Sequence, residues 1–186
     1  MKIMSFPDTT TGVNREKFAE VYDEYGPRIY QFIYYKTYHK ETAEDLTSQT
    51  FLRALEKLHY YNPEKGSMSA WIYQIARNLV TDHYRTKKYT VDIDDVWDLA
   101  GKQNVELDVQ NKEQLEELRE VLKKLPSEQR DILILRIWQD LSYKEIAQII
   151  GKTEGACKMM FSRLITRLRK ELSVAMLLLL FLHKIL

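Results

Sequence analysis

The segment LSYKEIAQIIGKTEGACKMMFSRLITRLR, residues 141–169, contains the signals of two helices joined by a tight turn. The Ser142 hydroxyl can accept a hydrogen bond from the amide of Glu145. The Glu145 carboxylate can accept one from the Ser142 amide, which completes a capping box at the start of a short helix. Gly151 suits the left-handed residue that ends such a helix, and Thr153 can cap the next helix. The spacing therefore predicts a helix-turn-helix.

The second helix of this motif has one apolar and one basic face. Apolar side chains recur every three or four residues and should face the core: Cys157, Met160 or Phe161, Leu164 and Leu168. The opposite face holds Lys158, Met159, Ser162, Arg163, Thr166, Arg167, Arg169 and Lys170, five of them cations. Such a face fits the phosphates and groove edges of duplex DNA. A basic helix can also be merely solvated, but the cap, the glycine turn and the cations together favour DNA binding.

Helical periodicity also runs through the first half of the chain. A first helix should begin at Asn14 as N-cap, with Phe18, Val21, Tyr22 and Tyr25 on one stripe. Gly26-Pro27 is expected to interrupt or kink it before Ile29, Phe32 and Ile33 resume the stripe.

Two more helices complete a first all-helical domain. One spans about 41–59, with Leu46, Phe51, Ala54, Leu55 and Leu58 inward. The other spans about 69–85, with Ile72, Ile75, Ala76, Leu79 and Val80 inward. Pro63 and Gly66 break the chain between them.

The distribution of charge divides the 186-residue chain, although its net charge is only +1. Residues 1–91 are net +2, residues 92–128 are net −6 and residues 129–186 are net +5. The sequence predicts an all-α protein of two small helical domains joined by an acidic linker. The expected boundaries are a disordered N-terminus at 1–14, a first domain at 15–90, the linker at 91–112, a helix-turn-helix domain at 113–172 and an apolar tail at 173–186.

Aromatic residues are concentrated in the first domain, which holds eleven of the twelve tyrosines before residue 90. Together with Arg77, Arg85, Lys87 and Lys88 they suit stacking on unpaired bases, with cations along the backbone. Burial is the expected role for Tyr22, Tyr25 and Tyr30, because they lie on or near apolar stripes.

Four separated motifs resemble one family. AEDLTSQTFLRAL at 43–55, WIYQIARN at 71–78, Leu125-Pro126 and the helix-turn-helix at 141–169 are similar, in that order, to an extracytoplasmic-function (ECF) sigma factor. The similarity spans about residues 16–172. It implies a specificity subunit of bacterial RNA polymerase, whose two domains read the -10 and -35 promoter elements.

The resemblance also implies roles for particular residues. Asp45, Gln49 and Arg53 would dock on the clamp helices of the largest polymerase subunit. The loop 62–68 and the next helix would capture a base flipped from the non-template strand, and Asn78 is the first choice for reading its edge. A locally hydrogen-bonded surface Asn is the alternative. The full -10 set is Lys65, Ser67, Trp71, Gln74, Arg77, Asn78 and Arg85.

The expected -35 set is Thr153, Lys158, Met159, Ser162, Arg163 and Arg167. The family usually has a polar or basic pair after the position of Lys158, whereas this chain has Met159 and Met160, so no -35 sequence can be inherited from the family. Met159 offers only apolar contact, for instance to a thymine methyl. The linker would thread through the polymerase near the RNA path, or it is simply a flexible, self-repelling tether.

The apolar tail has no counterpart in the family pattern. Leu177–Leu182 is apolar on all sides and would expose a sticky surface if free. It could pack on the first domain, bind a partner helix or touch a membrane surface.

Other functional classes have less support. The four histidines are scattered, neither an HExxH motif nor a phosphate-binding glycine loop occurs, and the single Cys157 excludes an internal disulfide. No catalytic residue, metal, cofactor or small-molecule substrate is expected. The first fifteen residues lack a signal-peptide core, and the longest apolar run falls short of the roughly 20 residues that span a bilayer, so a cytoplasmic protein is expected. Expected partners are core RNA polymerase, promoter DNA and an anti-sigma factor, possibly membrane-bound. The alternative is a one-component regulator that binds duplex DNA without polymerase.

Overall fold

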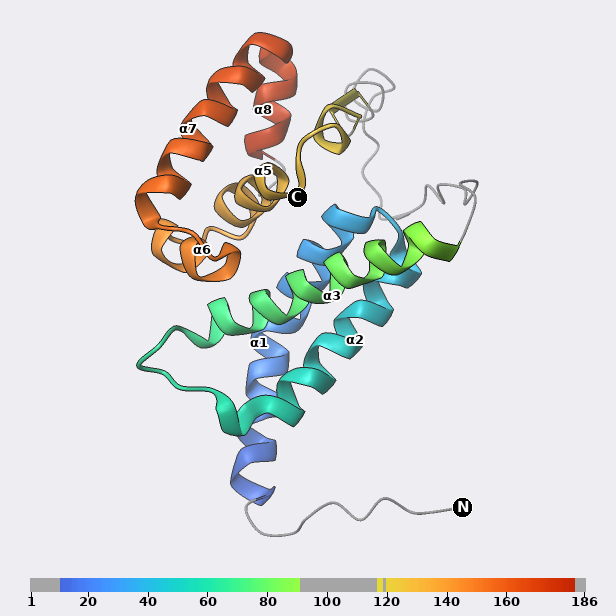
Figure 1. Ribbon diagram of the computed structural model, residues 1–186, viewed down its shortest axis with the longest axis vertical. Coiled ribbons are helices and arrows are strands. Elements are labelled where there is room, and N and C mark those ends of the chain that lie inside the picture. The colour runs from blue at the N-terminus through green and yellow to red at the C-terminus, as the bar shows by residue number, and fades with distance from the viewer. Residues whose placement is uncertain (1–10, 91–116, 119, 183–186) are drawn as a thin grey trace.

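The computed structural model describes residues 11–90, 117–118 and 120–182, and these residues contain helices and no strand. The first domain consists of α1 (Thr11–Thr37), α2 (Lys40–Lys57), the single 3-10 turn η1 (Leu58–Tyr60) and α3 (Met68–Thr90). The second contains α5 (Ser127–Leu133), η2 (Ile134–Trp138), α6 (Tyr143–Ile150), α7 (Glu154–Glu171) and α8 (Val174–Leu182). Figure 1 shows the two groups of helices one above the other. The predicted all-α, two-domain fold class is confirmed.

Helix α1 is longer and more continuous than the sequence predicted. It begins at Thr11, so the predicted N-cap at Asn14 is wrong. It also continues through Pro27, so the expected interruption there is wrong. Proline removes one backbone hydrogen bond, but Ile29, Phe32 and Ile33 immediately beyond it are completely buried. Their burial outweighs the loss of that bond.

Helices α2 and α3 pack beside α1 and close the first core. The N-cap of α2 is His39, whose ring nitrogen accepts a hydrogen bond from the Thr42 amide at 3.1 Å. Two inward assignments were wrong: Leu55 is 43% exposed, and Tyr22 is 50% exposed with its ring edge against Phe51 at 4.7 Å. Both residues lie at the border of the apolar stripe, where periodicity does not distinguish the rim of a core from its centre.

The second domain has a hydrophobic cluster of its own. Residues 117, 118 and 120–123 are helical, and Leu118, Leu122 and Leu125 pack with Leu133, Leu164 and Leu168. The π-helical turn η2 follows α5 directly and is capped by Gln139, whose amide donates a hydrogen bond to the Ile134 carbonyl at 3.1 Å.

Helix α8, the apolar tail, covers this second core. Met176 and Leu180 are buried against it, and the indole nitrogen of Trp138 donates a hydrogen bond to the Leu180 carbonyl at 3.0 Å. The tail therefore packs on its own domain, and the expectation that it could pack on the first domain is wrong. None of the described helices is both long and apolar enough to cross a membrane.

The two domains share one continuous apolar core. Buried residues of α1 and α3, such as Phe32 and Ile72, belong to the same cluster as Ile134, Ile146 and Ile149 of the second domain. Helix α6 is thereby held against α3, and η2 against α1 (Figure 1). The acidic linker predicted at 91–112, residues 1–10 and residues 183–186 lie outside the described residues.

Candidate nucleic-acid interface

The helix-turn-helix has the predicted local geometry. The Glu145 amide donates to the Ser142 hydroxyl at 3.2 Å, and the Ser142 amide donates to the Glu145 carboxylate at 3.0 Å. Gly151 adopts φ +71°, a left-handed conformation that costs glycine little. Thr153 accepts a hydrogen bond from the Ala156 amide at 3.2 Å and starts α7. Local hydrogen bonds thus fix both the beginning and the direction of the predicted recognition helix.

The basic face of α7 is exposed to solvent. All eight residues predicted to face outward are exposed, whereas Cys157, Leu164 and Leu168 are buried. Two of the cations pair along the helix, Lys158 with Glu154 and Arg167 with Glu171, each at 2.7 Å. Exposed pairs of this kind stabilise by only about 0.3–0.5 kcal/mol, so a phosphate can replace the carboxylate at little cost.

The loop between η1 and α3 is ordered by hydrogen bonds within itself. The Tyr61 hydroxyl donates to the Gly66 carbonyl at 3.2 Å, and the Tyr61 ring lies 5.4 Å from the ring of Trp71. The Ser67 hydroxyl accepts from the Ala70 amide at 3.1 Å and caps α3. Two aromatic rings and a helix N-terminus thus stand side by side, an arrangement suited to holding an unpaired base.

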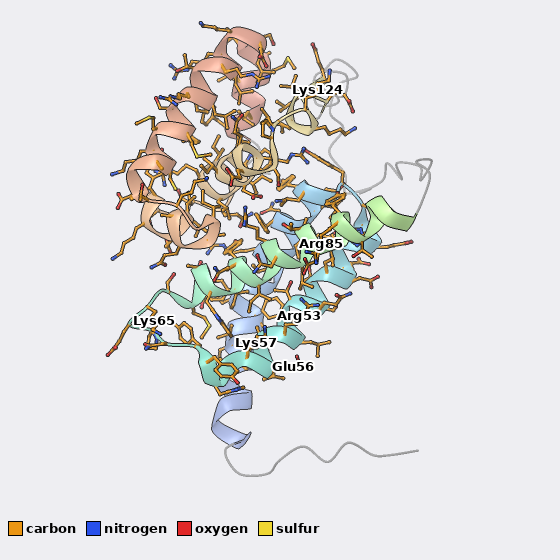
Figure 2. All side chains as sticks on the ribbon, in the orientation of Figure 1. Arg53, Glu56, Lys57, Lys65, Arg85 and Lys124 are labelled. Carbon is orange, nitrogen blue, oxygen red and sulfur yellow. The ribbon has the colours of Figure 1, made fainter. Side chains whose placement is uncertain are left out.

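Along α3, the predicted -10 residues divide into two groups. Gln74 and Asn78 are exposed one turn apart, and among the described residues Asn78 has no side-chain hydrogen bond. The described structure therefore offers no local hydrogen-bond partner for the Asn78 side chain, which the alternative interpretation requires. Figure 2 shows Lys65 in the loop at one end of α3 and Arg85 toward the other end, where Arg85 pairs with Asp82 at 3.2 Å. Arg77 differs, since its guanidinium faces the second domain.

Asp131 of α5 is the partner of Arg77, and the sequence analysis missed it. Its completely buried carboxylate accepts from the Arg77 guanidinium at 2.8 Å and from the Lys36 ammonium. Burial lowers the pKa of Lys36, and the adjacent Asp131 carboxylate opposes that shift. A lone acidic residue before the apolar run ILILRIW was a signal of a buried charge. Nothing local to it identifies the partner.

The predicted polymerase-binding residues lie together on α2. Asp45, Gln49 and Arg53 follow one another at four-residue steps, and all are exposed. Gln49 and Arg53 line one wall of an open pocket of about 300 Å³, and Asp82 of α3 lines the opposite wall. Figure 2 shows Arg53 with Glu56 and Lys57 near the end of α2. This polar face lies on the first domain and is not covered by the second.

The described residues hold no group of three or more histidine, cysteine, aspartate or glutamate side chains placed to bind a metal ion.

Comparison with known proteins matches both domains. The family model for Sigma-70 region 2 matches residues 21–90, and the model for Sigma-70, region 4 matches residues 115–168. The ECF RNA polymerase sigma factor SigM of Bacillus subtilis is 35% identical over 156 residues, covering 81% of this chain and 91% of SigM. The ECF sigma factor BldN of Streptomyces coelicolor is 32% identical over 92% of this chain, which spans 66% of the length of BldN.

A solved structure has the same fold. The sigma factor RpoE in its complex with the anti-sigma factor NepR from Bartonella quintana superposes with a TM-score of 0.67 at 25% identity. The match covers 83% of this chain and 96% of RpoE. With a basic helix-turn-helix, a separate helical domain and relatives along most of its length, this chain belongs to the ECF RNA polymerase sigma factors.

Proposed function

We propose that this ECF sigma factor binds core RNA polymerase in the cytoplasm, recognises paired -10 and -35 promoter elements and initiates transcription of a specific set of genes. It acts by positioning and strand separation rather than as an enzyme. The single observation that best supports this is the exposed basic face of α7 on a chain of this family.

The -35 element is read by α7 in the major groove. Thr153, Lys158 and Met159 lie at the N-terminal end of the helix, the end that reaches base edges in this motif. Ser162 and Arg163 follow one turn later, and Arg167 contacts phosphate. Met159, 54% exposed, supplies an apolar contact suited to a thymine methyl.

The -10 element is read as a single strand by the loop and α3. Unstacking a base costs a few kcal/mol, and stacking on an aromatic side chain returns about 1–3 kcal/mol. Trp71 supplies the stacking surface, while Asn78 and Gln74 supply donors and acceptors for the base edge. Lys65, Ser67, Arg77 and Arg85 contact the backbone.

Core polymerase docks on the α2 face formed by Asp45, Gln49 and Arg53, on the side of the first domain that the second leaves uncovered. An anti-sigma factor is the expected regulator. This expectation is supported by the similar protein RpoE, whose structure was solved in complex with the anti-sigma factor NepR.

Transcription of a pool of genomic fragments by purified core polymerase, with and without this protein, tests the proposal. New RNA 5′ ends that share paired upstream elements are the expected result. Retention of specific duplexes by the protein alone, with no new start sites, would overturn it in favour of a one-component regulator.

A further inference from the structure

The contact between the two domains is centred on a buried carboxylate. Asp131 is completely buried, and both of its cationic partners, Lys36 of α1 and Arg77 of α3, come from the other domain. Arg77 is itself only 20% exposed. A buried charge is tolerated only when it is paired. Asp131 therefore favours the arrangement in which α5 lies against α1 and α3.

Gln139 forms a second polar centre in the same contact. Its backbone carbonyl accepts from the Arg28 guanidinium at 2.5 Å, and its side-chain oxygen accepts from the Tyr73 hydroxyl at 2.7 Å. Its side-chain nitrogen donates to Gln31 at 3.2 Å. All three partners belong to the first domain. Gln139 is the C-cap of the π-helical turn η2, and both its backbone and its side chain bond to the first domain.

Apolar packing surrounds these two centres. The rings of Tyr35 and Trp138 lie 4.2 Å apart, and Ile134 and Ile146 are buried in one cluster with Phe32 and Ile72. The contact thus combines buried apolar side chains with the hydrogen bonds of Asp131 and Gln139, as a stable interface does.

The same contact reaches the loop proposed to bind the -10 strand. The Ser67 hydroxyl donates to the Glu145 carboxylate at 3.3 Å, and the Gln148 side chain donates to the Lys65 carbonyl at 3.3 Å. Helix α6 lies so close that a Cβ on Gly66 would stand 3.1 Å from Gln148. Counted with Arg77, three of the seven proposed -10 residues contact the second domain, Lys65 through its backbone carbonyl and Ser67 and Arg77 through their side chains.

We propose that the second domain is a built-in inhibitor of -10 recognition: Asp131 occupies at Arg77 the place that a DNA phosphate takes when the domains separate. Helix α6 contacts the adjacent loop in the same closed state, through Glu145 and Gln148. This inference rests on the proposed function, because it takes Lys65, Ser67 and Arg77 as contacts to DNA. The recognition face of α7 and the α2 face remain exposed in the closed state, so polymerase or duplex DNA can bind first and favour opening.

The affinity of a two-state protein falls in proportion to the fraction that is competent to bind. Weakening the closed state must therefore raise the apparent affinity for single-stranded DNA. Two variants in the second domain, Asp131→Asn and Gln139→Ala, weaken the closed state without replacing any residue proposed to contact DNA. The matched control is Glu128→Gln on the same helix, because Glu128 pairs with Lys152 of its own domain at 3.2 Å.

The full chain and each variant would be compared by small-angle X-ray scattering and by fluorescence anisotropy with a labelled single-stranded oligonucleotide, after circular dichroism confirms that they are folded. We expect a larger radius of gyration for Asp131→Asn and Gln139→Ala, and a gain of about tenfold or more in affinity. Glu128→Gln should match the wild type in both. If Asp131→Asn fails to fold, Gln139→Ala provides the same test.

Two results would overturn the inference. An unchanged radius of gyration in a folded Gln139→Ala would show that these contacts do not hold the domains together. Expansion without a gain in affinity would show that the second domain does not mask the strand-binding surface. Promoter-dependent initiation by the wild type tests the proposed function separately, so its failure is distinguishable from either result.

Discussion

The packing of α8 on the second domain leads to a quantitative prediction, because one helix carries both a buried and an exposed leucine. Leu180 is completely buried, whereas Leu178 is 56% exposed. We expect Leu180→Ala to lower the free energy of unfolding by about 2–3 kcal/mol, the lower part of the range for buried leucines. A terminal helix relaxes more readily than the centre of a core, so the upper part is not expected. At 2–4 °C per kcal/mol, this corresponds to a fall in Tm of roughly 4–12 °C.

The matched control is Leu178→Ala, which should change the free energy of unfolding by no more than about 0.5 kcal/mol. Because Trp138 bonds to the backbone carbonyl of Leu180, neither substitution removes that hydrogen bond. The difference between the variants therefore measures side-chain packing alone.

The assay is urea unfolding, monitored by circular dichroism and by tryptophan fluorescence, to which Trp138 beside α8 contributes. A variant truncated after Leu172 sets the upper limit for the loss of unfolding free energy, because it lacks α8 altogether. A nine-residue helix is unstable in water unless it is docked. Equal losses for Leu178→Ala and Leu180→Ala would refute the reasoning, because α8 would then not dock through its Met176 and Leu180 face.

The other predictions concern the proposed surfaces and the single thiol. Asn78→Ala should relax selectivity at one position of the -10 element, whereas Arg167→Ala should weaken binding evenly and lower the salt dependence by about one phosphate contact; an equal loss on every promoter for Asn78→Ala would contradict base reading. Asp45→Ala should reduce co-elution with core polymerase, while Glu44→Ala, about 100° around the same helix, should not; identical elution of both would count against the α2 face. Burial raises the pKa of the Cys157 thiol, so at pH 8 a smaller fraction of it is thiolate than in a solvent-exposed cysteine. Cys157 should therefore react with a disulfide reagent only after unfolding. Rapid labelling of the native protein would show that α7 does not pack as described.

Features that depend on neighbouring residues were predicted well. The capping box of Ser142 and Glu145, the left-handed Gly151 and the N-cap Thr153 involve groups at most three residues apart. The two faces of α7 follow from helical periodicity, which the sequence displays directly. Family membership was likewise readable, because its motifs are contiguous runs in a fixed order.

The errors arose where distant groups compete with local preference. Proline at position 27 locally opposes a helix, but burial of the residues beyond it carries α1 through. The tail is apolar on all sides, so its sequence could not show which core it would cover.

Sequence alone determined the helical fold class, the turn chemistry, the basic face of α7 and the family of this protein, because those depend on local hydrogen bonds, on periodicity and on contiguous motifs. The tertiary structure decided that Arg77 faces Asp131, that Gln139 joins the two domains and that α8 covers the second core. Partners 54 residues apart, such as Arg77 and Asp131, meet only when packing has brought their helices together. A buried charge acquires its role from the partner it meets there.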